Sequence, residues 1–262
     1  PLVKKASWLI HIDVDEFMNI KLGDGTLEEL LRSAGPAATN IAMTWRVYGH
    51  GGHDELGNAD VLRTFTTCAP NYVPKPHTMW GFKTMTRNLG IYKKLSCHRP
   101  NQPVDSPLQP PKWLNGSLKD ITAEAAQPGT WRSSPRTLGY DAIQLNHYAL
   151  RSRSSYLIKR KRGRALHTDR TIGLNYWIRH DWNSQTDLSI QRHIPRMEAV
   201  KDSLLSDPDL RLLHDEGLAW HRARVAELRE ADEFAGLWTA TRRTNLTDLE
   251  RVAYALASDM ET

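Results

Sequence analysis

The stretch that most constrains the fold runs from Trp8 to Phe17 and reads Trp-Leu-Ile-His-Ile-Asp-Val-Asp-Glu-Phe. It begins with an apolar run that lacks helical spacing, which is typical of a strand buried on both faces of a parallel sheet. Unpaired charges are costly to bury, so we expect the carboxylates to lie where this strand leaves the sheet. In open α/β sheets, that carboxyl edge is where ligands bind.

The two aspartates of this stretch, Asp13 and Asp15, are predicted to share one face. Residues two apart on a strand point the same way, so the carboxylates should converge while Val14 turns into the core. Two carboxylates at one point repel each other unless a cation lies between them, and Mg2+ or Mn2+ prefers such oxygen ligands. The alternative is an ordinary strand that ends in solvated acidic residues.

This acidic segment resembles the Asp-x-Asp segment of family 2-like glycosyltransferases with the GT-A fold. More narrowly, it is similar to a bacterial subgroup whose segment reads Asp-Val-Asp-Glu-Phe. Further matches follow in order, so that the resemblance covers about residues 7–190. They are Trp45–His53, Asn146-His147-Tyr148, Arg151-Ser152, Lys159 and Arg162-Gly163. The resemblance implies an α/β chain: a partial GT-A-type mixed sheet with flanking helices, plus a C-terminal helical region.

The resemblance also implies an activity. Such enzymes transfer a sugar, with inversion, from a nucleotide-diphosphate donor to a hydroxyl acceptor, here in cell-surface polysaccharide or glycan synthesis, and Mn2+ or Mg2+ assists. In the GT-A fold the nucleotide-binding half precedes the Asp-x-Asp segment, so we expect this chain to lack that half. Residues 1–190 would then be the C-terminal portion of the catalytic domain, and residues 191–262 a helical region with a structural or docking role.

A helix is predicted to begin near His147. At 3.6 residues per turn, Arg151, Ser155, Lys159 and Arg162 would lie along one stripe, with His147 one turn earlier. A helix N-terminus and a row of cations suit an anion about the length of a diphosphate.

Each residue of this stripe receives a predicted role. In many GT-A enzymes a late histidine completes the metal shell, and Asn-His-Tyr resembles that position. We therefore expect His147 to join Asp13 and Asp15 as a metal ligand. Arg151, Lys159 and Arg162, together with Asp13, would bind the donor diphosphate. The alternative is that His147 packs against Tyr148 or caps the helix, with the cations solvated.

The glycine-rich loop after Trp45 is the predicted acceptor side. Trp45 or Tyr48 would stack on a sugar ring, and His50 and His53 are further acceptor-binding candidates. Asp54 is the predicted general base, because a carboxylate can deprotonate the acceptor hydroxyl. Glu55 and Asp141 are the other base candidates, although Asp141 is expected to cap a following helix. The competing interpretation is a solvated hairpin loop with incidental charges.

Composition limits the class of protein. The chain of 262 residues, with 40% hydrophobic and 25% charged residues, is typical of a soluble globular protein, and no stretch is apolar for long enough to span a bilayer. Cys68 and Cys97 have no metal-like spacing and indicate a reducing compartment. We expect a cytoplasmic protein, either unattached or peripheral at the inner membrane face. Its net charge of +5 suits an anionic ligand, an anionic membrane surface or nucleic acid equally well.

Two other functions stay open. The basic run Lys159–Arg164 and nine tryptophans could form a non-catalytic module that binds a polyanion, either nucleic acid or an acidic glycan. We do not expect a nucleic-acid partner, because aromatic residues are poorly interleaved in that run. A metal-dependent phosphodiesterase is the third hypothesis, but it normally needs more His and Asp ligands near the first pair.

Local patterns predict several elements. A capping box of Thr26 and Glu29 begins a helix that ends at Gly35, and Thr247 with Glu250 begins the last helix. Strands are expected at residues 41–48, at 61–67, and at 81–87 and 92–97 around a turn. Residues from His98 to about Pro135 read as a long lid or insertion over the acceptor site.

Overall fold

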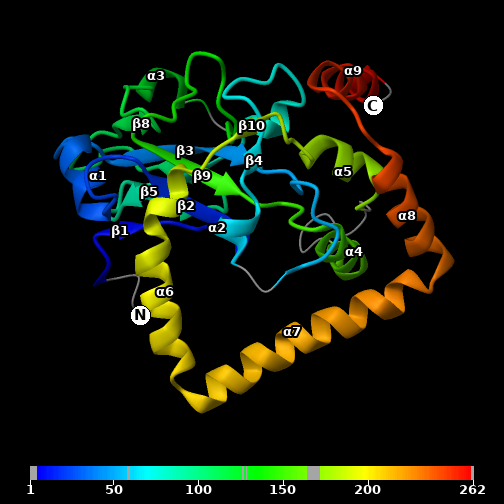
Figure 1. Cartoon of the computed structure of the whole chain (residues 1–262). Coiled ribbons are helices and arrows are strands. Elements are labelled where there is room, and N and C mark those ends of the chain that lie inside the picture. The colour runs from blue at the N-terminus through cyan, green and yellow to red at the C-terminus, as the bar shows by residue number, and fades with distance from the viewer. Residues whose placement is uncertain (1–4, 58–59, 126, 128, 164–171, 261–262) are drawn as a thin grey trace. The chain divides into compact units, whose positions relative to one another are not determined.

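The computed structural model describes residues 5–57, 60–125, 127, 129–163 and 172–260. The chain is mixed α/β with a C-terminal helical region, as expected (Figure 1). It forms two compact units. The first comprises Pro1–Arg46 and Asn71–His147, and the second Val47–Pro70 and Tyr148–Thr262. The predicted domain boundary at residue 190 stays a prediction.

A mixed sheet forms the centre of the first unit. Its strands follow the order β1-β5-β3-β9-β2, and β8 pairs in parallel with β3, whereas the pairs β1/β5, β3/β5 and β2/β9 are antiparallel. The strands are β1 (Trp8–Leu9), β2 (Glu16–Ile20), β3 (Asn40–Val47), β5 (Phe82–Arg87), β8 (Trp113–Asn115) and β9 (Ile143–His147). The predicted mixed sheet is therefore confirmed, and the GT-A topology stays a prediction.

The predicted helix after Thr26 is confirmed as α1 (Leu27–Ala34). The Thr26 side chain accepts a hydrogen bond from the backbone N–H of Glu29 at 3.2 Å, which satisfies one of the donors left over at a helix start. Gly35 ends the helix with φ 78°, a conformation that glycine adopts without a steric cost.

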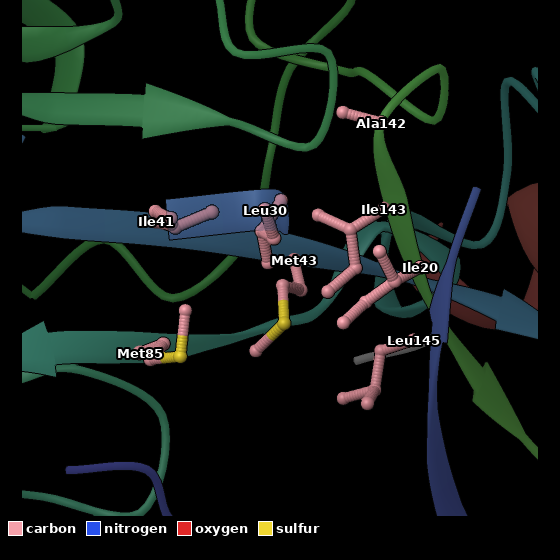
Figure 2. Packing of buried hydrophobic residues seen from close by; sticks show 8 residues of the cluster. All are labelled: Ile20, Leu30, Ile41, Met43, Met85, Ala142, Ile143 and Leu145. Atoms are coloured by element: carbon pink, nitrogen blue, oxygen red, sulfur yellow. The ribbon is translucent and has the colours of Figure 1, made fainter. Parts of the chain in front are cut away.

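The core of this unit joins α1 to the sheet (Figure 2). Leu30 of α1 and Ile41, Met43, Ile143 and Leu145 of the strands are fully buried, and Figure 2 shows them converging. The remaining members of this cluster are Ile20, Met85 and Ala142. Burial of each such side chain contributes about 1.5–3 kcal/mol of hydrophobic free energy, so the sheet is a rigid support for residues at its ends.

The acidic stretch does not form the predicted buried strand. Strand β1 ends at Leu9, and β2 begins only at Glu16 and runs antiparallel to β9. Because β1 and β2 lie at opposite ends of the strand order, the residues between them must cross the sheet instead of extending either strand. Val14 is 94% exposed, so its predicted burial is wrong.

The helix predicted to begin near His147 is also wrong at its start. His147 is the last residue of β9 and lies opposite Glu16 of β2. Arg151 has φ 58°, which no helical residue adopts, and Ser152 then caps α4 (Arg153–Arg162) by accepting from the Ser155 backbone N–H at 3.1 Å. The predicted stripe is therefore interrupted. Ser155, Lys159 and Arg162 lie on α4, whereas Arg151 precedes it. Asp141 precedes a strand, so it caps no helix.

The region around β5 also differs from the prediction. Strands β5 and β6 (Tyr92–Leu95) both exist, but β6 pairs with β7 (Pro100–Pro103) and not with β5. The predicted long loop from His98 contains β7, β8 and the short helix α3 (Thr122–Ala125). A short 3-10 helix, His77–Trp80, precedes β5.

The second unit is mainly helical. The predicted strand at residues 61–67 is wrong, because Val61–Thr64 is helix α2 and only Thr67–Cys68 forms a strand, β4, which pairs with β10 (Gln185–Thr186). The longer helices are α4, α5 (Leu174–His180), α6 (Ile194–Leu205), α7 (Pro208–Arg229), α8 (Asp232–Arg243) and α9 (Asp248–Met260), with a 3-10 helix at Ser189–His193. None of the described helices is both long and apolar enough to cross a membrane.

Local signals in this second unit are confirmed at its C-terminal end. Thr247 accepts from the Glu250 backbone N–H at 3.3 Å, and the Glu250 carboxylate accepts from the Thr247 backbone N–H at 2.8 Å. This reciprocal pair is the predicted capping box before α9. Helix α4 packs against α7 and α8 through Leu157, Leu228 and Trp238.

Candidate functional site

The candidate site lies in the first unit, where residues 10–15 cross one end of the sheet. At this end β3 finishes near Trp45, β5 begins next to Lys83, and β9 finishes at His147. The crossing segment turns at Asp13, whose carbonyl accepts from the Glu16 backbone N–H at 3.0 Å. The turn therefore places the acidic residues against the ends of three strands.

Glu16 organises this turn. Its side chain is buried; Oε2 accepts from the Asp13 backbone N–H at 2.8 Å, and Oε1 accepts from the Trp45 indole N–H at 2.7 Å. Burial raises the pKa of Glu16 to about 7, because a buried carboxylate loses its hydration. Both carboxylate oxygens are occupied by these contacts, so Glu16 positions Asp13 and Trp45.

Lys83 places a buried positive charge beside the acids. Its side chain is 1% exposed, and Nζ lies 3.0 Å from Asp13 Oδ2 and 3.7 Å from Glu16 Oε2. The Asp13 side chain is 53% exposed, so its carboxylate contacts both the solvent and the buried Lys83 ammonium. A buried ammonium requires such partners, since an isolated one is prohibitively costly. Lys83 thus holds Asp13 in place.

Asp15 and His147 approach each other at the same end of the sheet. Asp15 Oδ1 lies 3.9 Å from His147 Nε2, and both side chains are mostly buried. Two ligands of one Mg2+- or Mn2+-like ion lie about 3 Å apart when adjacent and about 4 Å apart when opposite, given bonds of about 2.1 Å. The oxygen and nitrogen pair therefore fits two positions in such a shell.

Asp13, the third predicted metal ligand, is engaged differently. Its Oδ2 is in contact with Lys83, which leaves Oδ1 as the oxygen that could reach a cation. Within the described residues, no three His, Cys, Asp or Glu side chains form a cluster able to hold a metal. The structure thus brings Asp15 and His147 together, whereas the Asp13 carboxylate contacts Lys83.

Aromatic rings line the site. The Trp45 ring lies 4.6 Å from the His147 ring, 5.6 Å from the His98 ring and 6.4 Å from the Trp131 ring, measured between centroids. The side chains of Trp45, His98 and Trp131 are partly exposed, whereas His147 is buried, and exposed ring faces suit a sugar or a base. Burial lowers the pKa of His98, which favours its neutral imidazole.

Gly81 makes room for this arrangement. A Cβ atom at Gly81 would lie 2.3 Å from Trp45 Cζ3, which is far closer than real atoms approach. The glycine is therefore required by the position of the Trp45 ring, since its own φ of −53° suits any residue.

The acceptor-side candidates other than Trp45 belong to the second unit. His50 is buried; its Nδ1 lies 2.6 Å from Asp181 Oδ1, and its ring lies 4.9 Å from that of Trp177. These contacts give His50 a structural role in this unit. His53 is exposed, with its ring against Phe65. Acceptor binding by either residue stays a prediction.

The predicted base Asp54 is an ion-paired residue of the second unit. One carboxylate oxygen contacts Arg153, and the other lies 3.6 Å from Arg242. Among the alternatives, Glu55 pairs with Arg229 at 3.1 Å, and Asp141 of the first unit accepts from the Ser117 hydroxyl at 2.7 Å. An acceptor hydroxyl would compete with two guanidinium groups for Asp54.

The predicted diphosphate residues also lie in the second unit. Lys159 donates to the Ala149 carbonyl at 2.7 Å and lies 5.3 Å from the Tyr176 ring. Arg162 is exposed near the C-terminal end of α4, and Arg151 precedes the helix. Arg164, at the end of the basic run, lies outside the described residues.

The sequence interpretation missed four residues of the site: Glu16, Lys83, His98 as a ring partner of Trp45, and Trp131. Glu16 stands in the acidic segment itself, and its apolar neighbour Phe17 was the available signal of burial. Lys83 lies in a strand of mixed polarity, so its neighbours do not mark it as a buried charge. No local pattern marks Trp131, which lies in a region without periodicity.

No protein-family model matches the chain, and no curated protein matches its sequence. The class that the fold defines is a mixed α/β protein with a C-terminal helical region.

Proposed function

We propose that the sheet end around Asp15 and His147 is the metal and donor site of a glycosyltransferase with a GT-A-type sheet. The enzyme would transfer a sugar from a nucleotide-diphosphate donor to the hydroxyl of a glycan or related acceptor, with inversion. The observation that supports this most is the approach of Asp15 and His147 to 3.9 Å, although 131 residues of chain lie between them.

The site residues would act as follows. Asp15 and His147 would hold Mn2+ or Mg2+, with Asp13 as the neighbouring carboxylate, and such an ion offsets the charge of the diphosphate leaving group. Lys83 and Glu16 keep Asp13 in position through the contacts described above. Trp45, supported by Glu16, offers a ring face on which a sugar can stack.

The base and the diphosphate contacts remain as the sequence predicts them. Asp54 would accept the proton of the acceptor hydroxyl once its arginine partners release an oxygen. Arg151, Lys159 and Arg162 would border the diphosphate, and Lys159 would exchange its contact with the Ala149 carbonyl for it.

The alternative function, binding of a polyanion by the basic run, has less support. Of its four described cations, Arg160 pairs with Glu233 at 2.6 Å and Lys159 donates to a backbone carbonyl. These two side chains are therefore engaged within the protein, although a polyanion would need them as partners.

Binding of Mn2+ to the full chain tests the metal site directly. We expect Asp15→Asn to lower Mn2+ affinity in a calorimetric titration by about tenfold or more while the fold persists, because one charged ligand is lost. Asp105→Asn, which changes an exposed aspartate of the same unit, is the control and should leave affinity unchanged. Equal affinity of both variants and the unaltered protein would remove the metal assignment.

Sugar transfer tests the activity. Release of nucleoside diphosphate from UDP- and GDP-sugars should require Mn2+ or Mg2+ and a hydroxyl acceptor. Release of nucleoside monophosphate and sugar phosphate without an acceptor would favour the phosphodiesterase hypothesis instead.

A further inference from the structure

A cavity of the first unit contains a buried arginine. It has a volume of about 520 Å³ and lies between the β6–β7 hairpin and β8. This volume falls within the range of about 300–1,000 Å³ that is typical of small-molecule sites. Its described lining consists of two aromatic rings, two prolines, two amides, a threonine and Arg99. The cavity is thus largely apolar and contains one charge.

Arg99 has no anionic partner among the described residues. It is 8% exposed, its Nε donates to the Pro100 carbonyl, and its Nη1 donates to the carbonyls of Gln127 and Thr130. Its Cζ lies 4.8 Å from the ring centre of Trp113. A guanidinium has five N–H donors, so these contacts leave the two on Nη2 without an acceptor in the described part of the chain.

A buried arginine without a carboxylate is unusual. Burial of an unpaired charge is costly, and neutral carbonyls offset that cost only in part. Burial accordingly lowers the pKa of Arg99. An anion in the cavity would compensate this charge.

Tyr92 offers a second donor to the same cavity. Its hydroxyl oxygen accepts from Asn40 Nδ2 at 2.9 Å and from the Trp113 indole N–H at 3.0 Å. Both partners can only donate, so the hydroxyl proton of Tyr92 must point elsewhere. No acceptor for it lies among the described residues.

The orientation of the Asn40 amide supports this assignment. Its Nδ2 also donates to the Thr39 hydroxyl, and that hydroxyl donates to the Lys112 carbonyl at 3.1 Å. With the Thr39 hydroxyl hydrogen on that carbonyl, the Thr39 oxygen accepts from Asn40, and the structure places the amide N–H on that side. The Tyr92 hydroxyl therefore faces a donor at Asn40.

From these contacts we propose that this cavity binds a small organic carboxylate with an apolar, preferably aromatic, body. The two carboxylate oxygens would accept from Arg99 Nη2 and from the Tyr92 hydroxyl, while the aromatic and proline walls enclose the body. A single negative charge matches the single guanidinium, whereas a dianionic phosphate would leave an uncompensated charge in an apolar space. The proposal does not depend on the proposed transferase activity.

Ligand-observed NMR with 4-fluorobenzoate tests the charge requirement. The 19F signal of 4-fluorobenzoate should respond saturably to the full chain, and its neutral counterpart 4-fluorobenzamide should bind at least tenfold more weakly. Equal binding of the two probes, or no binding of the carboxylate, would overturn the proposal.

Two matched variants locate the site. Arg99→Lys retains the charge but loses the Nη2 donors and should weaken benzoate binding at least tenfold. Arg132→Lys is the control, because Arg132 also lies over a tryptophan, at 5.0 Å from Trp131, but is exposed and does not line this cavity. An equal loss in both variants would contradict the site.

A measurement on the unaltered protein covers the case in which Arg99→Lys fails to fold. Bound 4-fluorobenzoate should give intermolecular NOEs to the ring protons of Tyr92 and Trp113 and shift the Trp113 indole N–H resonance. NOEs to other aromatic rings, without these, would place the ligand elsewhere and refute the proposal.

Discussion

The Glu16 carboxylate accepts a hydrogen bond of 2.7 Å from the Trp45 indole, and its second oxygen accepts one of 2.8 Å from the Asp13 backbone. One buried residue thus connects the aromatic face of the candidate site to its acidic turn. It also lies 3.7 Å from Lys83, which contacts Asp13 in turn. A substitution at Glu16 should therefore alter both the acidic turn at Asp13 and the position of the Trp45 ring.

The raised pKa of Glu16 predicts a pH-dependent stability. Its folded pKa of about 7 lies above the ordinary value of 4.5, so between these pH values the folded protein holds a proton that the unfolded chain has released. The free energy of unfolding should then fall as pH rises through this window, by on the order of 3 kcal/mol. Urea unfolding from pH 4 to 8 measures this, and Glu16→Gln should flatten the profile. Parallel profiles of both proteins would contradict the assignment.

A shared ion predicts that Asp15 and His147 are coupled. Asp15→Asn and His147→Gln should each lower Mn2+ affinity by about tenfold or more, as expected for groups that bind or orient a metal. In the double variant the loss of Mn2+ affinity should be much smaller than the product of the two single losses. Once one ligand is gone, removing the other has a smaller effect. Calorimetric titration of the four proteins completes the cycle. Fully multiplicative losses would mean that the two residues act independently.

Asp54 has two separable roles to test. Asp54→Asn removes the carboxylate between Arg153 and Arg242 and should cost about 1–2 kcal/mol of stability, because the mostly buried Arg153 loses its partner. As the general base, it should also lower turnover far more than donor affinity. Glu55→Gln is the control: its pair with Arg229 is about half exposed and should contribute about 0–1 kcal/mol. Normal turnover in Asp54→Asn would move the base to Glu55 or Asp141.

Gly81 should not tolerate a side chain. Gly81→Ala brings a Cβ to 2.3 Å from the Trp45 ring, so the ring must shift, at a cost of about 1–3 kcal/mol. Chemical denaturation measures the loss, and near-UV circular dichroism should report the altered tryptophan. Gly217→Ala in the open middle of α7 should instead stabilise the protein by about 1 kcal/mol. A neutral Gly81→Ala would show that the Trp45 ring has more room than its contacts indicate.

Two helix starts and one strand agree with the signals that their neighbouring residues carry. The helix after Thr26 and the capping box at Thr247 are both formed by hydrogen bonds between residues three apart. Strand β3 was recognised from its alternating apolar residues, within one residue of its start. These features are local, so nearby residues suffice to specify them.

Signals that depend on distant partners were misread. His147 carries a helix-like pattern after it, yet it is a strand residue because β9 pairs with β2 along its whole length. The acidic stretch looks like one continuous strand, yet its two ends join opposite edges of the sheet. Glu16 and Lys83 acquire their role only from each other and from Trp45.

The sequence by itself determined the residue types at the candidate site, the ends of the capped helices and the acidic segment that suggests a cation. Tertiary structure alone decided that Asp15 meets His147, that Lys83 holds Asp13, and that Arg99 faces an apolar cavity without a carboxylate in the described residues. The physical reason is that capping and periodicity act within one or two turns of chain. Sheet pairing and charge burial instead depend on which distant segments fold against each other.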